Sequence, residues 1–141
     1  MVNCLYGKLS CYDAKQVAGL LATPPPQQPA DRQGRRALVD VFAAGGAMRW
    51  QSDLGESNKF AALSMVLAPN AVIAVVQQQQ KNRAQPQWYV AAFDKEMGRQ
   101  LWRQEINGKP LPDGLLVDRD GQVVVTMLDG SLRCYAARQS P

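Results

Sequence analysis

The chain has 141 residues, of which 46% are hydrophobic and 20% are charged. This length and composition allow one domain with its own core and exclude a disordered tail. Sixteen basic and twelve acidic residues leave a net charge of +4, and the basic residues are scattered, which argues against a nucleic-acid-binding surface. The sequence has no histidine, and this excludes Ser-His and Cys-His triads, histidine-bearing zinc sites and imidazole bases.

The N-terminal residues 1–22 are expected to form a partial sheet unit. No secretory signal is expected, because the first ten residues have neither a basic start nor an apolar run. The three cysteines, Cys4, Cys11 and Cys134, are odd in number and widely spaced, which argues against a disulfide framework and a CxxC site. Cys11 and Cys134 lie in strand-like segments and are predicted to be small buried apolar residues.

A proline-rich and then basic segment occupies residues 23–36 and predicts an exposed loop or linker. It contains three consecutive prolines from Pro24 and the basic cluster Arg32, Arg35 and Arg36. We interpret these arginines as part of a solvated loop, with weak binding of an acidic partner as the alternative.

Residues 37–141 are expected to hold the main β-structure. Short runs rich in β-branched and aromatic residues, clearest at 71–76, 88–93 and 123–128, predict strands because they are too short for typical helices. Pro69-Asn70 divides the longest apolar stretch of the chain, which predicts two strands around a turn rather than a membrane helix.

Two of the segments that connect these strands have sequences that predict their type of turn or loop. Asp118 to Gly121 predicts a hairpin turn, since glycine supplies the positive φ that such a turn needs. A calcium loop is not expected there, because the downstream glutamate is missing, and Asp113, Asp118 and Asp120 are interpreted as solvated turn residues. The segment Gln77 to Gln87 predicts a long polar loop, either a tolerated surface insertion or a partner-binding loop.

An internal repeat links the two ends of the chain. The segment Leu5 to Ala14 aligns with Leu128 to Ala137, and six of the ten positions are identical. The offset is 123 residues, which equals three units of 41. A unit of 41 residues has the usual length of a four-stranded propeller blade.

A second pattern lies between the two copies. From Ala92 the chain has a strand end, then Asp94, Gly98 and Trp102, and a weaker copy keeps Gly46 and Trp50. The aspartate can fix a turn by accepting backbone N–H groups, the glycine permits a left-handed conformation, and the tryptophan supplies a large apolar area.

The segment from Ala92 to Trp102 resembles the tryptophan-docking motif of PQQ-like, quinoprotein-type β-propeller repeats, Ala-x-Asp-x-x-Thr-Gly-x-x-x-Trp. It matches at Ala92, Asp94, Gly98 and Trp102, with Met97 in place of threonine. The likeness covers residues 37–137 well and residues 5–21 in part, where Asp13 is kept and Leu21 stands in place of tryptophan. The resemblance implies that each indole docks on the neighbouring blade.

The resemblance predicts an all-β chain, a partial β-propeller with about two complete four-stranded blades plus pieces of flanking blades. We expect each blade to begin with the strand that follows its tryptophan. One blade would then use 103–106, 115–117, 123–128 and 131–135, and the preceding blade 51–54, 63–67, 71–76 and 88–93. A ring of eight blades needs roughly 340 residues, so we expect a fragment of a longer protein or association with other chains.

Three functions follow as hypotheses. The first is a non-catalytic propeller segment that acts as a protein-binding or scaffolding surface, similar to propellers in bacterial outer-membrane assembly and signalling proteins. Its partner would be another protein, the remaining blades of the parent chain, or a second copy through open blade faces. A full-length relative is expected to be periplasmic or extracytoplasmic.

The second hypothesis is a remnant of a PQQ-dependent alcohol or sugar dehydrogenase, which would use the quinone and calcium. The resemblance would then require a vicinal cysteine pair and a calcium-binding set, and the sequence shows neither. No catalytic, cofactor-binding or metal-binding residue is therefore assigned. The third hypothesis is a lone all-β domain with no kinship to propellers.

Overall fold

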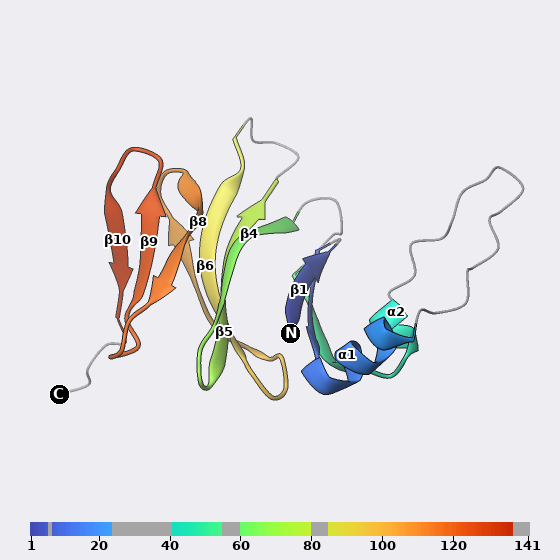
Figure 1. Ribbon diagram of the computed structural model, residues 1–141. Coiled ribbons are helices and arrows are strands. Elements are labelled where there is room, and N and C mark those ends of the chain that lie inside the picture. The colour runs from blue at the N-terminus through green and yellow to red at the C-terminus, as the bar shows by residue number, and fades with distance from the viewer. Residues whose placement is uncertain (6, 24–40, 55–59, 80–84, 137–141) are drawn as a thin grey trace, which may run out of the picture.

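Three antiparallel sheets follow one another along the chain in the computed structural model, which describes residues 1–5, 7–23, 41–54, 60–79 and 85–136 (Figure 1). The described residues contain ten strands and two short helices, so the prediction of a mostly β chain is confirmed. None of the helices described is long and apolar enough to span a membrane.

The middle sheet is a four-stranded meander in which each strand pairs with the next one in sequence. Its strands are β4 (Phe60–Leu67), β5 (Ala71–Gln78), β6 (Gln87–Asp94) and β7 (Gln100–Ile106). The predicted turn at Pro69-Asn70 joins β4 to β5 and is confirmed. The residues of β5 from Ala71 to Val76 are all apolar and all buried, because neighbouring sheets cover both faces of this strand.

The first sheet has three strands, β1 (Val2–Leu5), β2 (Lys8–Tyr12) and β3 (Met48–Asp53). Between β2 and β3 the chain forms α1 (Ala14–Ala22) and α2 (Val41–Ala44). Asp13 caps the N-terminus of α1, because its carboxylate accepts the backbone N–H groups of Lys15 and Gln16 at 2.9 and 3.1 Å. Val17 of α1 packs in a small cluster with Tyr12 and Ala47, which attaches the helix to this sheet.

The third sheet has the strands β8 (Pro110–Val117), β9 (Val123–Met127) and β10 (Leu132–Tyr135). The predicted hairpin between β8 and β9 is confirmed, and Leu116 pairs with Val124. Asp118 fixes the turn by accepting the N–H groups of Asp120 and Gln122, while Gly121 takes a φ of +80°.

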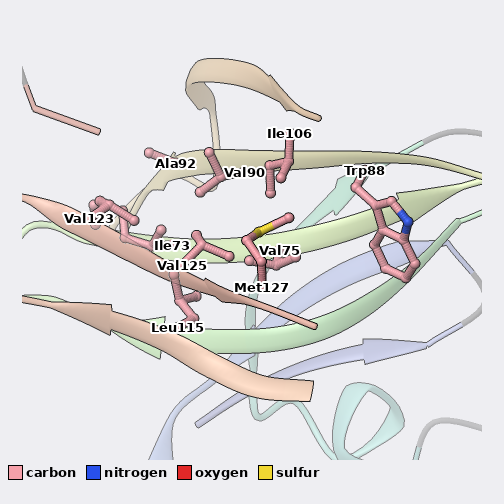
Figure 2. Packing of buried hydrophobic residues seen from close by; sticks show 11 residues of the cluster. Ile73, Val75, Trp88, Val90, Ala92, Ile106, Leu115, Val123, Val125 and Met127 are labelled. Carbon is pink, nitrogen blue, oxygen red and sulfur yellow. The ribbon is translucent and has the colours of Figure 1, made fainter. Parts of the chain in front are cut away.

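The three sheets pack face to face through two apolar cores. Side chains of β5 alternate between them, since Val72, Ala74 and Val76 face the first sheet while Ile73 and Val75 face the third. Figure 2 shows the second core, where the middle sheet meets Leu115, Val123, Val125 and Met127. The middle sheet is therefore buried on both faces, and each outer sheet is covered on one face by the described residues.

The predicted grouping of strands into blades is wrong by one strand. Ala92 pairs with Trp102, so the tryptophan strand β7 closes its own sheet instead of opening the next one. In the same way Cys11 pairs with Trp50, which places β3 in the first sheet. The reason is local: the turn between Asp94 and Gly98 folds the chain back onto the strand that precedes it. The described residues consequently contain one four-stranded and two three-stranded sheets, not two complete four-stranded ones.

Two predicted loops lie partly or mostly outside the described residues. Except for Thr23, the proline-rich segment 23–36 with Arg32, Arg35 and Arg36 lies outside the described residues. The glutamine loop is shorter than predicted, because Gln77 and Gln78 belong to β5 and pair with Trp88 and Gln87 of β6. Residues 80–84 of that loop also lie outside the description.

Candidate functional site

The turn between β6 and β7 is built as its residues predict. The Asp94 carboxylate accepts the backbone N–H groups of Glu96 and Met97 at 3.0 and 2.7 Å. Gly98 has a φ of +71°, and the N–H of Asp94 donates to the carbonyl of Arg99 at 2.8 Å. These contacts reverse the chain so that the Trp102 strand returns beside Ala92.

The first sheet contains the same turn with a long insertion inside it. Asp13 accepts two backbone N–H groups, and its own N–H donates to the carbonyl of Ala47 at 2.8 Å, as Asp94 donates to Arg99. Gly46 has a φ of +77° and precedes Trp50 by four residues, as Gly98 precedes Trp102. The two incomplete copies recognised in the sequence are therefore one motif, split by residues 14–45. Leu21 lies in α1 and does not occupy the tryptophan position.

Trp50 docks on the middle sheet. Its indole Nε1 donates a hydrogen bond of 2.7 Å to the carbonyl of Lys95, and its ring packs over Gly98. A Cβ atom at Gly98 would lie 2.6 Å from Cδ2 of the indole, so only glycine leaves room for the ring. The neighbouring Ser52 hydroxyl donates to the Gly98 carbonyl. Trp50 is 8% exposed as a result.

Trp102 is placed differently. It holds the equivalent position on β7 but is 37% exposed, so it is not docked in the same way by the described residues. A cavity of about 570 Å³ lies beside it, lined by Val123 and by Cys134, Tyr135 and Ala136 of the third sheet. A separate small space of about 40 Å³ lies between the first and middle sheets and is bordered by Asp53, Leu54 and Arg103.

Other equivalent positions in the first and third sheets also differ in exposure. Pairing with Trp50 and Trp102 makes Cys11 of β2 equivalent to Ala92 of β6. The sequence repeat makes Leu9 and Cys11 equivalent to Leu132 and Cys134 of β10. Leu9 is 0% exposed and Cys11 is buried against the middle sheet, whereas Leu132 is 61% exposed and Cys134 is exposed. The prediction that Cys134 is buried is wrong for this reason.

These exposed residues define an apolar surface that we call the open face. It is the side of the third sheet that points away from the middle sheet, at one end of the stack in Figure 1. Its side chains alternate with the buried residues of β8 and β9. They are the exposed Leu116, Leu132 and Cys134 and the half-buried Val124 and Thr126.

The titratable groups do not form a catalytic arrangement among the described residues. No group of three or more Cys, Asp or Glu side chains there could hold a metal ion. Asp120 is exposed on the turn after β8, as expected, whereas Asp113 is exposed within β8 and is not a turn residue. Burial raises the pKa of the half-buried Cys4 thiol and of the Tyr135 hydroxyl. The Ser131 hydroxyl lowers the pKa of Asp129, as expected for a turn residue.

A second concavity of about 930 Å³ lies near the other end of the middle sheet. It is bordered by Trp88, Ile106, Lys109 and Pro112. Its lining includes one carboxylate, Glu105, which receives a hydrogen bond from Gln87 at 3.2 Å. The described residues of this lining include no Ser, Thr or Cys side chain, so the concavity carries no catalytic assignment.

Comparisons with known proteins found no family model, no curated protein and no solved structure that matches this chain. Of the residues singled out in the sequence, Gly98 and Trp50 come together in one contact, and Gly46 and Asp94 fix the two turns. Open blade faces were expected from the sequence, but the residues of this face were not named, and Cys134 was predicted to be buried.

Proposed function

We propose that this chain is a non-catalytic segment of a PQQ-like β-propeller whose open face binds protein. The observation that carries this proposal is the docking of Trp50 on Lys95 and Gly98 of the next sheet, which is the contact that the resemblance implies. The consecutive strand order of the middle sheet and the contact between the inner strands β4 and β8 support a fan of blades.

The protein-binding role is supported by the repeat. The segments Leu9 to Tyr12 and Leu132 to Tyr135 share leucine, cysteine and tyrosine at the same places in equivalent strands. In the first sheet the middle sheet covers Leu9 and Cys11, and in the third sheet the equivalent Leu132 and Cys134 are exposed. An exposed apolar patch of this kind marks an interaction surface.

A concentration series tests the binding role. Without its partner, the wild-type chain should self-associate through the open face, and the Leu132→Lys variant should sediment as a monomer. The matched control is Leu21→Lys, because Leu21 is 68% exposed but lies on α1, far from the open face in sequence and sheet order. Association that survives Leu132→Lys, or a wild type that stays monomeric throughout, would contradict the proposal.

The dehydrogenase hypothesis is tested by titrating the chain with pyrroloquinoline quinone in the presence of calcium. We expect no change in the quinone spectrum and no rise in the melting temperature, since a bound ligand stabilises the folded state by mass action. Saturable calcium-dependent binding together with alcohol-dependent dye reduction would establish the alternative function instead.

A further inference from the structure

We propose that the concavity beside Trp88 binds a proline-rich segment of a partner polypeptide. This concavity shares no lining residue with the open face, so the inference goes beyond the proposed function. Its volume of about 930 Å³ falls in the range of ligand-binding pockets. It lies where one end of the middle sheet meets the connection from β7 to β8.

The indole of Trp88 carries a hydrogen-bond donor without an acceptor. Trp88 is 7% exposed, and no described residue accepts a hydrogen bond from its Nε1, whereas Nε1 of Trp50 donates to the Lys95 carbonyl. Among the described residues, the fully enclosed and unpaired side-chain polar atom is Oγ of Ser64, so the Trp88 nitrogen is not sealed. Figure 2 shows this nitrogen on the side of the ring that is turned away from Val75. Because buried tryptophans normally have a partner for this N–H, we expect a ligand in the concavity to supply the acceptor.

The neighbours of this indole add an amide and apolar surface. Gln77 of β5 and Ile106 of β7 lie directly beside Trp88 in the strand register, so the three side chains share one face of the sheet. The half-buried Gln77 amide makes no side-chain hydrogen bond with the described residues, so its N–H groups are also available. The apolar side chains that complete the lining are Leu63, Pro86 and Pro112.

The charges and the burial of the indole narrow the class of ligand. The charged residues in the described lining are Glu105 and Lys109, and both are exposed. One charge of each sign gives the concavity no net attraction for phosphate or another anion. The low exposure of Trp88 leaves little of either ring face uncovered, which disfavours ligands that bind by stacking on an aromatic ring. A neutral ligand with apolar groups and hydrogen-bond acceptors fits best.

A proline-rich segment has this chemistry. Each proline supplies a carbonyl acceptor and an apolar ring but no backbone N–H, so it brings no donor that would stay unpaired in the concavity. Such segments favour the polyproline II conformation, which has no internal hydrogen bonds and leaves every carbonyl available. Proline-rich peptides dock in aromatic-lined grooves of other proteins in this way. Here one carbonyl would accept from Nε1 of Trp88 while neighbouring rings pack on Leu63 and Ile106.

Nuclear magnetic resonance reads the indole N–H directly. The chain has three tryptophans, whose Nε1–H signals can be assigned with the variants Trp88→Phe and Trp102→Phe. The probe is a blocked hexaproline peptide, which contains no aromatic ring. Its addition should move the Trp88 signal downfield until it saturates, because the N–H gains an acceptor. The Trp50 signal should stay in place, because its N–H already donates to Lys95.

Two substitutions separate the hydrogen bond from the ring. Trp88→Phe keeps an aromatic ring but removes the donor, and it should weaken hexaproline binding about two- to tenfold, as for one lost hydrogen bond. Trp102→Phe is the matched control, because Trp102 borders a different cavity, and it should leave the affinity unchanged. If melting curves show that Trp88→Phe is unfolded, Gln77→Leu replaces it and should weaken binding by removing the neighbouring amide.

The proposal fails if the Trp88 signal does not move at the solubility limit of the peptide, or if a glycine-serine peptide of the same length moves it equally. Saturable shifts caused by maltohexaose or by inorganic phosphate, without an effect of hexaproline, would also overturn it and assign another ligand class. The Leu132→Lys variant should bind hexaproline as the wild type does. This result would keep the concavity distinct from the open face, so that the two proposals stand or fall separately.

Discussion

The first and third sheets carry the same Leu-x-Cys-Tyr segment in equivalent strands and differ in what covers it. Leu9 and Cys11 are buried by the middle sheet, whereas Leu132 and Cys134 are open to solvent. The residues and the strand are the same, so the burial of each copy is decided by the neighbouring sheet. The comparison shows that in a stack of this kind each sheet depends on the next one for its core.

The two docking tryptophans offer the largest expected contrast in stability. Trp50→Ala should lower the free energy of unfolding by about 3–5 kcal/mol, because it removes a buried ring from the interface between two sheets. Trp102→Ala should cost about 1 kcal/mol, near the average for a point substitution, since this ring is 37% exposed. Urea unfolding of both variants measures the difference, and equal losses would show that the two indoles have the same environment.

The repeated leucines give the next contrast. Leu9→Ala should lower the free energy of unfolding by about 2–5 kcal/mol, as for other fully buried leucines. Leu132→Ala should change it by at most about 0.5 kcal/mol, because its side chain is 61% exposed. The free energies of unfolding should be measured by urea denaturation at a protein concentration where the chain is monomeric. A large loss for Leu132→Ala would mean that the open face is covered.

The sequence predicted the local elements well because their signals are local. The strands around Pro69-Asn70, the hairpin at Asp118 to Gly121 and the turn between Asp94 and Gly98 each depend on residues a few positions apart. The grouping of strands into sheets was wrong by one strand because sheet membership is decided by pairing. The Asp94 turn leads β7 back to pair with β6, the strand before it, and the sequence pattern alone does not show whether β7 pairs with β6 or with the strand after it.

The candidate site was only partly predictable for a related reason. The split motif was recognised as two weak copies, because residues 14–45 separate Asp13 from Gly46 in the sequence but not in the structure. The exposure of Cys134 could not be predicted from its strand-like segment, because its equivalent Cys11 owes its burial to another sheet. Local patterns thus predict turns and strands, and long-range packing decides which faces remain open.

The N-cap of α1 gives the smallest expected effect and depends on pH. The backbone N–H of Gln16, aided by that of Lys15, holds the pKa of Asp13 below its usual value. Because the pKa is lower in the folded state, the ionised Asp13 stabilises the fold at pH values above the usual aspartate pKa of about 4. This stabilisation is lost as the pH falls through the folded-state pKa. Asp13→Asn keeps a capping side chain and should remove this pH dependence. Melting curves for both proteins between neutral and acid pH measure it, and identical profiles would contradict it.

The docking of Trp50 on the turn of the next sheet is tested most directly by a pair of glycine substitutions. Gly98→Ala and Gly46→Ala both force a residue with a Cβ into a positive φ, at about 1–2 kcal/mol each, and a Cβ at Gly46 meets no atom within 4 Å. Gly98→Ala also drives the Cβ into the Trp50 ring, which should add roughly 1–3 kcal/mol. We predict that equilibrium unfolding shows Gly98→Ala to be the more destabilising by this added amount and that the difference disappears in a Trp50→Ala background. Equal losses for the two glycines in the wild-type background would contradict the docking of the sheets through Trp50.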